Sequence, residues 1–317
     1  GFRPQRGAHK AVLKCGEFIE QGYVFTVDMD LEKFFDTVSH SKLIEVLSRT
    51  VKDGRVVSLI HRYLNAGVIN RCKYEPSQLG VPQGGPLSPM LSNIMLNELD
   101  KELERRGHKF VRYADDLVIF CKSRKAAQRT YEHIVPFIEK KLFLKVNKEK
   151  TKVAYMRDIK FLSYAFGRRN GKCQFRLHSE SIKKMKDKIR ELTSRSNGWS
   201  YEYRKQRLQW YIRGWSNYFS LAGYKRGLEE WDSWLRRRIR MCIWKSWKRV
   251  RTRYRNLQKL VPDENRIRIA AFSRKSYWRM ASHPVVHEAM SDERLKKAGY
   301  PTFTEYYVDF NKARGYY

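Results

Sequence analysis

The clearest pattern near the start of the chain is a strict alternation of apolar and polar side chains. It covers residues 25–30, in the order Phe25, Thr26, Val27, Asp28, Met29 and Asp30. Successive side chains of a β-strand point to opposite faces, so the alternation predicts a strand that carries both aspartates on one face. The apolar residues then face the core. For each aspartate taken singly, a solvated strand end is the alternative.

A second apolar segment predicts a β-hairpin. Two β-rich runs, residues 110–114 and 117–120, flank the adjacent carboxylates of Asp115 and Asp116. Neighbouring carboxylates repel one another, and hard divalent cations both take oxygen ligands and screen that repulsion. The hairpin is therefore a candidate metal site. A surface turn is the alternative, because Asp is an ordinary turn residue.

A loop rich in proline and glycine, residues 80–89, precedes a predicted helix. The apolar positions of that helix recur at i, i+4 spacing, at Leu91, Met95, Leu99 and Leu103. We expect Ser88 to cap the helix, Pro89 to occupy its first position and Gly107 to end it. Paired glycines let the backbone approach a ligand closely, so this loop is a candidate binding loop. The alternative is an ordinary connecting loop, because Pro and Gly are common in loops that precede helices.

The second half of the chain has helical spacing and a different composition. All eight tryptophans lie after residue 198, and this break predicts a second domain. Three apolar stripes predict three packed helices, formed by Ile182, Met185, Ile189 and Leu192, by Leu208, Tyr211, Trp215 and Phe219, and by Leu228, Trp231, Leu235 and Cys242. Most of the tryptophans are therefore expected in the core, with stacking on nucleic-acid bases as the alternative.

The charge is strongly basic. The 317 residues suit two or three domains and include 66 Lys and Arg against 33 Asp and Glu, for a net charge of +33 and a pI of about 10.1. The charge is +14 over residues 1–177, +16 over 178–260 and +3 over 261–317. An excess of this size is typical of proteins that bind phosphate backbones, and a solvated charged surface is the alternative.

Several classes of protein are not indicated. The five cysteines contain no C-x-x-C pair, so we expect reduced thiols rather than a zinc ribbon or a disulfide framework at Cys15, Cys72, Cys121, Cys173 and Cys242. No apolar run approaches the roughly 20 residues of a membrane helix, and no signal peptide is visible. We therefore expect no membrane partner.

In chain order, the motifs resemble those of the reverse transcriptases encoded by group II introns, and the similarity extends from Gly1 to the C-terminus. Residues 1–9 resemble that family's second conserved block, and residues 30–36, 82–85 and 113–116 resemble its three palm motifs, with sequences DLEKFFD, PQGG and YADD. Residues 147–152 resemble the fourth motif, and residues 159–164 the primer-grip block, although the family usually has Gly where Ser163 stands. Residues 213–219 resemble the maturase-domain signature.

The resemblance implies a two-metal active site, with Mg²⁺ as the expected ion and Mn²⁺ as a substitute. The implied catalytic residues and metal ligands are Asp30, Asp115 and Asp116. Phe35 would exclude a 2′-hydroxyl and so select deoxynucleotides, because that hydroxyl distinguishes RNA from DNA. Gln83 and Gly84 would contact the incoming nucleotide, and Lys150 would lie near its phosphates. Asp28 shares a strand face with Asp30 and stays an alternative ligand.

The implied fold is α+β. It consists of a right-hand polymerase palm with an antiparallel sheet and flanking helices, partial fingers, and an all-α thumb/maturase domain. We expect partial fingers and palm over residues 1–177, the thumb/maturase domain over 178–260, and a C-terminal extension of that region over 261–317. The basic residues expected to bind RNA are Arg213, Arg236, Arg237, Arg238, Arg240, Lys245, Lys248 and Arg249.

The implied function is RNA-directed DNA polymerisation by a group II intron protein that also assists splicing and mobility. Its expected partners are intron RNA, an RNA template with a DNA primer, and deoxynucleoside triphosphates, and we expect a monomer on RNA in the bacterial cytoplasm. No counterpart of the family's endonuclease domain is recognised, so target-DNA cleavage is not expected. Because the sequence opens inside a family block, we also expect a fragment without the N-terminal fingers elements.

Two alternatives remain open. One is a maturase that only assists splicing, as an RNA chaperone. The presence of the three aspartates and Gln83 favours the polymerase over this alternative. The other is a bacterial reverse transcriptase used in defence or diversity generation. The maturase-like signature and the basic helices favour the intron class over it.

Overall fold

The computed structural model describes residues 1–70, 73–75 and 77–313. The chain divides into two compact units, Gly1–Phe175 and Arg176–Tyr317. The first unit mixes strands and helices, whereas the second is helical except for the end of one strand. The predicted α+β class, with an antiparallel sheet followed by an all-helical region, is confirmed.

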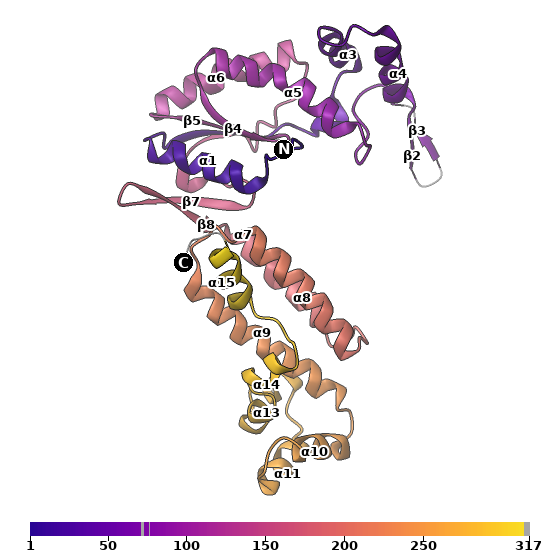
Figure 1. The fold of residues 1–317 in the computed structure, drawn as a ribbon, viewed down its shortest axis with the longest axis vertical. Helices are drawn as coiled ribbons and strands as arrows, with labels where there is room; N and C mark the ends of the chain where they lie inside the picture. The colour runs from indigo at the N-terminus through magenta and orange to yellow at the C-terminus, as the bar shows by residue number, and fades with distance from the viewer. Residues whose placement is uncertain (71–72, 76, 314–317) are drawn as a thin grey trace. The chain divides into compact units, whose positions relative to one another are not determined.

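A four-stranded antiparallel sheet forms the centre of the first unit (Figure 1). Its strands lie in the order β4-β5-β1-β6, with bounds β4 Lys109–Tyr113, β5 Asp116–Cys121, β1 Phe25–Met29 and β6 Lys152–Tyr155. Val27 of β1 pairs with Ile119 of β5 on one side and with Val153 of β6 on the other. The strand and the hairpin predicted from the sequence are confirmed.

Helices cover both faces of this sheet (Figure 1). The side chains of Val27, Met29, Leu117 and Ile119 belong to a buried cluster with the helices α5 (Ser88–Arg105) and α6 (Arg124–Lys141). The opposite face meets α1 (Ala8–Glu20), where the rings of Phe18 and Phe120 lie 5.6 Å apart. Asp28 and Asp30 therefore lie on the face away from the α5–α6 core.

The remaining elements of the first unit are short. They are α2 (Phe34–Thr37), α3 (His40–Ser48), α4 (Gly54–Asn65), the strands β2 (Val68–Asn70) and β3 (Lys73–Glu75), and a short helix η1 (Met156–Asp158). A further hairpin pairs β7 (Tyr164–Arg169) with β8 (Lys172–Leu177), and the boundary between the units falls within β8.

Helix α5 follows the prediction in its stripe and its end, but not in its cap. The four stripe residues are buried, and Gly107 adopts φ +71° just beyond the last turn. Ser88, however, is the first helical residue and caps nothing, so Pro89 stands second in the helix and not first. Its hydroxyl donates to the carbonyl of Pro82 at 2.5 Å and so closes the preceding loop. The prediction that Ser88 is the cap was wrong because a tertiary acceptor competes for its hydroxyl.

The second unit begins with the three helices predicted from the apolar stripes, α7 (Ser179–Leu192), α8 (Tyr201–Tyr218) and α9 (Lys225–Ser246). Six shorter helices follow: α10 (Val250–Gln258), α11 (Glu264–Phe272), α12 (Tyr277–Met280), α13 (Pro284–Ala289), α14 (Asp292–Lys297) and α15 (Phe303–Ala313). One buried cluster contains residues of both sets, among them Trp231, Ile267 and Phe303. The later helices therefore complete the core of the first three.

Most of the tryptophans contribute to packing, as the sequence predicts. Trp231, Trp244 and Trp247 are buried, and Trp199, Trp215 and Trp234 pack against the cluster. Trp210 differs, because its side chain is 60% exposed on α8.

Four cysteines are free thiols, namely Cys15, Cys121, Cys173 and Cys242, whereas Cys72 lies outside the described residues. Among the helices in the described part of the chain, none has the length and apolar character needed to cross a bilayer.

Candidate functional site

The tip of the β4–β5 hairpin carries two carboxylates. Tyr113 pairs with Asp116, so Ala114 and Asp115 alone form the turn. Ala114 adopts φ +56°, a left-handed conformation that is unfavourable for a residue with a Cβ atom. Such strained residues persist where the surrounding structure holds them, often at functional sites.

The pairing of β1 with β5 brings a third carboxylate to this tip. Met29 pairs with Leu117, so extending the register by one residue places Asp30 opposite Asp116. Directly opposed residues of an antiparallel pair lie on the same face of the sheet. Asp28, two residues earlier in β1, shares that face. The structure therefore gathers the three predicted aspartates and the alternative ligand Asp28 in one region.

Burial and neighbouring like charges raise the pKa of two of these carboxylates, Asp116 and Asp28. Burial raises the pKa of Asp116, and the charges of Asp115 and Asp30 raise it further. Burial also raises the pKa of Asp28 to about 6, against the opposing effect of Lys152. Both shifts disfavour the charged forms of Asp116 and Asp28, and a bound cation would favour those charged forms.

The donor set suits a hard divalent cation, because carboxylate oxygens are its preferred ligands. Within the described residues, no group of three His, Cys, Asp or Glu side chains is arranged closely enough to enclose an ion. The residues thus fit a divalent metal by the chemistry and charge of their oxygens, and the side-chain positions do not define a coordination geometry.

The loop of residues 147–151 is hydrogen-bonded to the backbone of Asp30 and places Lys150 beside it. The N–H of Asn147 donates to the Asp30 carbonyl at 2.9 Å, and the hydroxyl of Thr151 accepts from the Asp30 N–H at 3.2 Å. The Lys150 ammonium lies 3.5 Å from the Asp30 carboxylate, with the two side chains 70% and 38% exposed. An exposed pair of this kind contributes less than about 1 kcal/mol, so Lys150 can exchange its carboxylate partner for a phosphate oxygen easily.

One residue of this site was missed in the sequence. The guanidinium of Arg112 forms two hydrogen bonds with the Asp100 carboxylate, at 2.7 and 2.5 Å, and a third with the carbonyl of Ala114 at 2.8 Å. The side chains of the pair are only 6% and 17% exposed. Arg112 therefore braces the turn that presents Asp115. The available signal was an arginine that directly follows the apolar pair Phe110 and Val111 in the predicted hairpin.

Two of the residues predicted to contact a nucleotide, Phe35 and Gln83, come together at α2. Phe35 is half-buried, with its ring 5.3 Å from that of Phe34, and the amide of Gln83 lies 3.5 Å from an oxygen of Asp36. The backbone N–H of Val81 donates to the carbonyl of Phe35, which ties the loop before α5 to α2.

Two glycines give this loop its shape. Gly80 adopts φ +89°, and a Cβ atom there would lie 2.7 Å from the carbonyl oxygen of Phe35. Gly84, the predicted nucleotide contact, adopts φ +83° in open space. The close approach of the two backbones therefore requires glycine at position 80, and exposed backbone remains available at position 84.

The turn between η1 and β7 explains why the family motif usually contains glycine. Leu162 and Ser163 form a two-residue turn between Phe161 and Tyr164, at φ +48° and +67°. Turns with two left-handed residues favour glycine because a Cβ atom is crowded there. The backbone of Ser163 adopts this left-handed conformation even though serine has a Cβ atom. Serine in place of glycine at this position therefore leaves the turn geometry intact.

Two of the arginines expected to bind RNA are instead buried in the helical unit. Arg236 and Arg240 are 3% and 4% exposed. Arg236 donates to the carbonyl of Tyr300, and Arg240 donates to that of Met290 and pairs with Asp292. Burial lowers the pKa of both groups. The expectation that these two residues form an RNA-binding surface is therefore corrected: they join α9 to the C-terminal helices.

The other basic residues are more accessible. Arg237 lies 4.0 Å from the ring centre of Trp278, and Arg238 donates to the hydroxyl of Thr193 at 2.5 Å. Lys245 lies over the ring of Tyr277. Exposed positions are held by Arg213, Lys248 and Arg249. These three carry the accessible charge of the predicted set.

Comparison with known proteins connects these features to a family. Residues 1–166 match the family model described as reverse transcriptase (RNA-dependent DNA polymerase), and residues 182–261 match the group II intron, maturase-specific domain. The first match contains the predicted catalytic and nucleotide-binding residues of the palm. The second contains α8, α9 and α10, together with α7 apart from its first three residues.

Individual relatives resemble parts of the chain. Protein YkfC of Escherichia coli strain K12 is 32% identical over 199 residues, which cover 50% of this chain and 51% of that protein. Group II intron-encoded protein LtrA of Lactococcus lactis subsp. cremoris is 29% identical over 266 residues, covering 60% of this chain and 44% of LtrA. The solved structure of apo telomerase from Candida tropicalis has a TM-score of 0.47 at 12% identity, covering 96% of this chain and 52% of that one.

The chain spans about half the length of the curated relatives described above. The reverse transcriptase model nevertheless covers more than half of this chain, and the maturase-specific model follows it in the helical unit. The chain therefore belongs to the reverse transcriptase (RNA-dependent DNA polymerase) family, in the group that carries a group II intron maturase-specific domain.

Proposed function

We propose that the chain carries out RNA-directed DNA synthesis for a group II intron, and that it binds intron RNA in support of splicing and mobility. The observation that carries the proposal is the gathering of Asp30, Asp115 and Asp116 at the tip of the β4–β5 hairpin, inside the segment that matches the reverse transcriptase family. We also propose that it acts in the bacterial cytoplasm as a complex with that RNA.

The three aspartates would hold the catalytic divalent metal, with Mg²⁺ the natural choice among hard cations. When bound in a two-metal site, such ions activate the attacking primer hydroxyl and stabilise the leaving oxygen. The remaining work belongs to side chains that position the substrates. Lys150 neutralises phosphate charge beside Asp30, and Arg112 holds the turn that presents Asp115.

The nucleotide side of the site is formed by α2 and the loop before α5. Gln83 and the exposed backbone at Gly84 supply polar contacts for the incoming nucleotide. Phe35 supplies a ring that is supported from behind by Phe34. A ring fixed in this way leaves no room for a 2′-hydroxyl, which gives selection for deoxynucleotides.

The direct experiment is extension of a labelled DNA primer annealed to an RNA template, with four deoxynucleotides and a divalent cation. The proposal predicts products that grow to the end of the template. Binding of intron RNA without any extension would instead favour the alternative of a maturase that only assists splicing.

Replacing Phe35 by Val should relax sugar selection. The smaller side chain opens space beside the 2′ position, so we expect the preference for deoxynucleotides over ribonucleotides to fall by about tenfold or more. Competition between the two nucleotide types in single-turnover extension measures this ratio. Phe137→Val is the matched control, because it removes the same atoms from a half-buried ring of α6 that packs against the same core, and it leaves both rings of α2 unchanged. An unchanged ratio in folded Phe35→Val would exclude the gate.

Replacing Arg213, Lys248 and Arg249 together by Ala should weaken binding of intron RNA. Each phosphate contact contributes about 0.7–0.9 to the slope of log affinity against log salt, so three lost contacts would lower the magnitude of that slope by about two to three units. A salt titration of RNA binding measures it. The control variant replaces three exposed basic residues of α6 in the first unit, namely Arg124, Lys125 and Arg129. Equal slopes for wild type and the first variant would contradict the assignment.

A further inference from the structure

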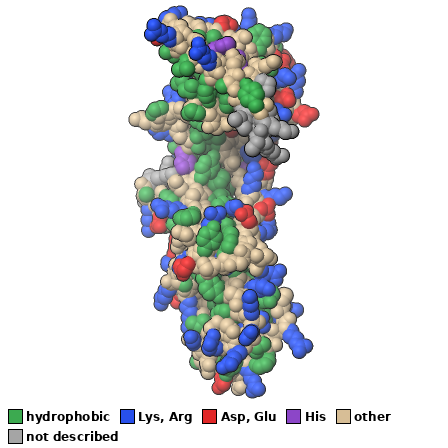
Figure 2. Space-filling model, turned by 90° about the vertical axis from the view of Figure 1, so that its right-hand side faces the viewer, with side chains coloured by type: hydrophobic (Ala, Val, Ile, Leu, Met, Phe, Trp, Pro, Cys, Tyr) green, Lys and Arg blue, Asp and Glu red, His purple; other side chains and the backbone are tan. Residues whose placement is uncertain are grey.

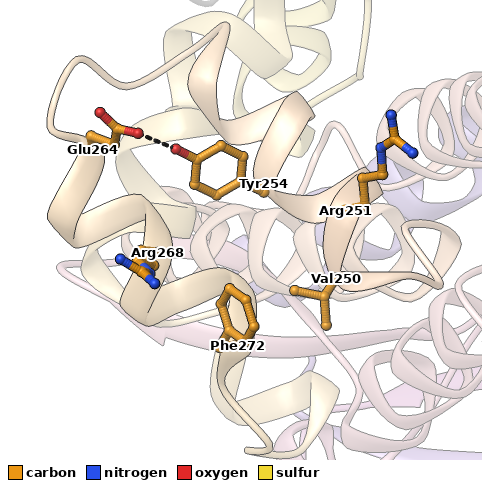
Figure 3. Close-up of a pocket in the computed structure, with 6 residues that line it drawn as sticks. All are labelled: Val250, Arg251, Tyr254, Glu264, Arg268 and Phe272. Carbon is orange, nitrogen blue, oxygen red and sulfur yellow. Dashed lines mark hydrogen bonds between the residues drawn. The ribbon is translucent and has the colours of Figure 1, made fainter.

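A pocket opens between α10 and α11, at the edge of the segment that matches the maturase-specific domain (Figure 3). Its volume is about 500 Å³. The side chains of Val250 and Phe272 face one another across it, with the ring of Tyr254 beside them. Phe272 is 63% exposed, so its ring is presented to solvent rather than used in the core.

Two cations flank this aromatic surface. Arg251 and Arg268 line the pocket and are exposed, and neither guanidinium forms a hydrogen bond or ion pair within the described part of the chain. Between Lys248 and Arg268 the sequence contains eight Lys or Arg residues and two acidic ones. Basic side chains crowd the lower end of the face drawn in Figure 2, the end that carries α10 and α11 in Figure 1. This excess of positive charge attracts negatively charged ligands, and a polyanion such as a nucleic-acid strand interacts with several of these side chains at once.

One acidic side chain lies at the pocket, and its role is different. The hydroxyl of Tyr254 donates to a carboxylate oxygen of Glu264 at 2.5 Å, which fixes the orientation of both groups. The second oxygen of Glu264 has no hydrogen-bond partner within the described residues and can accept an N–H group from a ligand. A ligand that suits the whole pocket therefore combines a flat ring, an N–H edge and a phosphate.

We propose that this pocket binds one unpaired nucleotide of an RNA strand, with its base against Phe272 and Tyr254 and its flanking phosphates at Arg251 and Arg268. Exposed aromatic rings next to cations are the usual means of holding single-stranded nucleic acid, because every base has a face that can stack. A base inside a duplex is covered by its neighbours and cannot enter. The inference rests on the proposed RNA-binding function and names a subsite for it.

The test measures binding of the full chain to a fluorescent 12-nucleotide single-stranded RNA, to the same strand in a duplex, and to a version with abasic sugars. Removing one stacking ring should cost about a factor of ten in affinity. We therefore expect Phe272→Ala to bind the single strand about tenfold more weakly, and Phe272→Trp to bind it like wild type. Ile269→Ala, on the same helix and 69% exposed but outside the pocket, is the matched control.

Further outcomes separate stacking from charge. Phe272→Ala should leave the affinity for the duplex and for the abasic strand unchanged, and it should leave the salt dependence unchanged. Arg268→Ala should lower the salt slope for the single strand by somewhat under one unit. If wild type binds single-stranded RNA and Phe272→Ala binds it equally tightly, or loses affinity for the abasic strand to the same extent, the pocket assignment is wrong while the proposed function stands. If wild type binds no RNA, both fail.

Discussion

Replacing Asp115 by Asn is expected to abolish DNA synthesis while leaving RNA binding almost unchanged. The substitution keeps the size of the side chain at the turn but removes a negative charge from the proposed metal site. Metal-assisted stabilisation contributes several kcal/mol to such reactions, and each 1.36 kcal/mol is a factor of ten in rate. Single-turnover primer extension should therefore slow by roughly a thousandfold or more.

The control for this experiment is Asp158→Asn, which removes an exposed carboxylate from the same unit. It should extend the primer at the wild-type rate. Because the phosphate-binding surface does not include Asp115, a titration with template RNA should give the same affinity for all three proteins. Extension by Asp115→Asn at a rate close to wild type would remove this residue from the active site.

The second large effect is expected at Arg112. Arg112→Met leaves the largely buried carboxylate of Asp100 without its partner, and the cost of breaking a fully buried pair, about 3–5 kcal/mol of unfolding free energy, is the upper bound for this pair. Urea denaturation measures the loss. The control is Arg105→Met, since Arg105 pairs with Glu102 at the surface with its side chain 69% exposed. Loss of such a surface pair should cost less than about 1 kcal/mol.

A double variant separates stability from function. Arg112→Met with Asp100→Leu removes both charges and should recover most of the lost stability, because an apolar pair of similar volume can replace a buried ion pair. The carbonyl of Ala114 still lacks its donor in this protein, so the turn that presents Asp115 is no longer held. We expect DNA synthesis to remain at least tenfold below wild type. Full activity in the stable double variant would limit Arg112 to a structural role.

Local periodicity was sufficient to predict much of the fold. The alternation at residues 25–30, the hairpin around Asp115 and Asp116, the stripe of α5 and the three long helices of the second unit all appear in the structure. Each of these residue patterns lies within one helix or strand, or within two strands that follow one another in the sequence. The face shared by Asp28 and Asp30 follows from the same period of two.

Features that depend on distant partners could not be predicted in this way. Arg236 and Arg240 stand in a basic run that suggests a surface, yet their carbonyl acceptors lie 64 and 50 residues further along the sequence. The hydroxyl of Thr151 meets the backbone of Asp30 across 121 residues. Sequence spacing carries no information on which carbonyl lies opposite a side chain in the folded chain. For the same reason, sequence spacing could not show which of Asp28 and Asp30 is the metal ligand, because that depends on which of them lies opposite the β4–β5 hairpin tip.

The most direct test of the proposed active site compares Asp30→Asn with Asp28→Asn in single-turnover incorporation of the first deoxynucleotide on an RNA template. Asp30 lies opposite Asp116 and beside Lys150, whereas Asp28 is more deeply placed in the strand. We predict almost no incorporation by Asp30→Asn, and a rate within about tenfold of wild type for Asp28→Asn. Incorporation by folded Asp30→Asn at the wild-type rate would contradict the assignment of the catalytic centre.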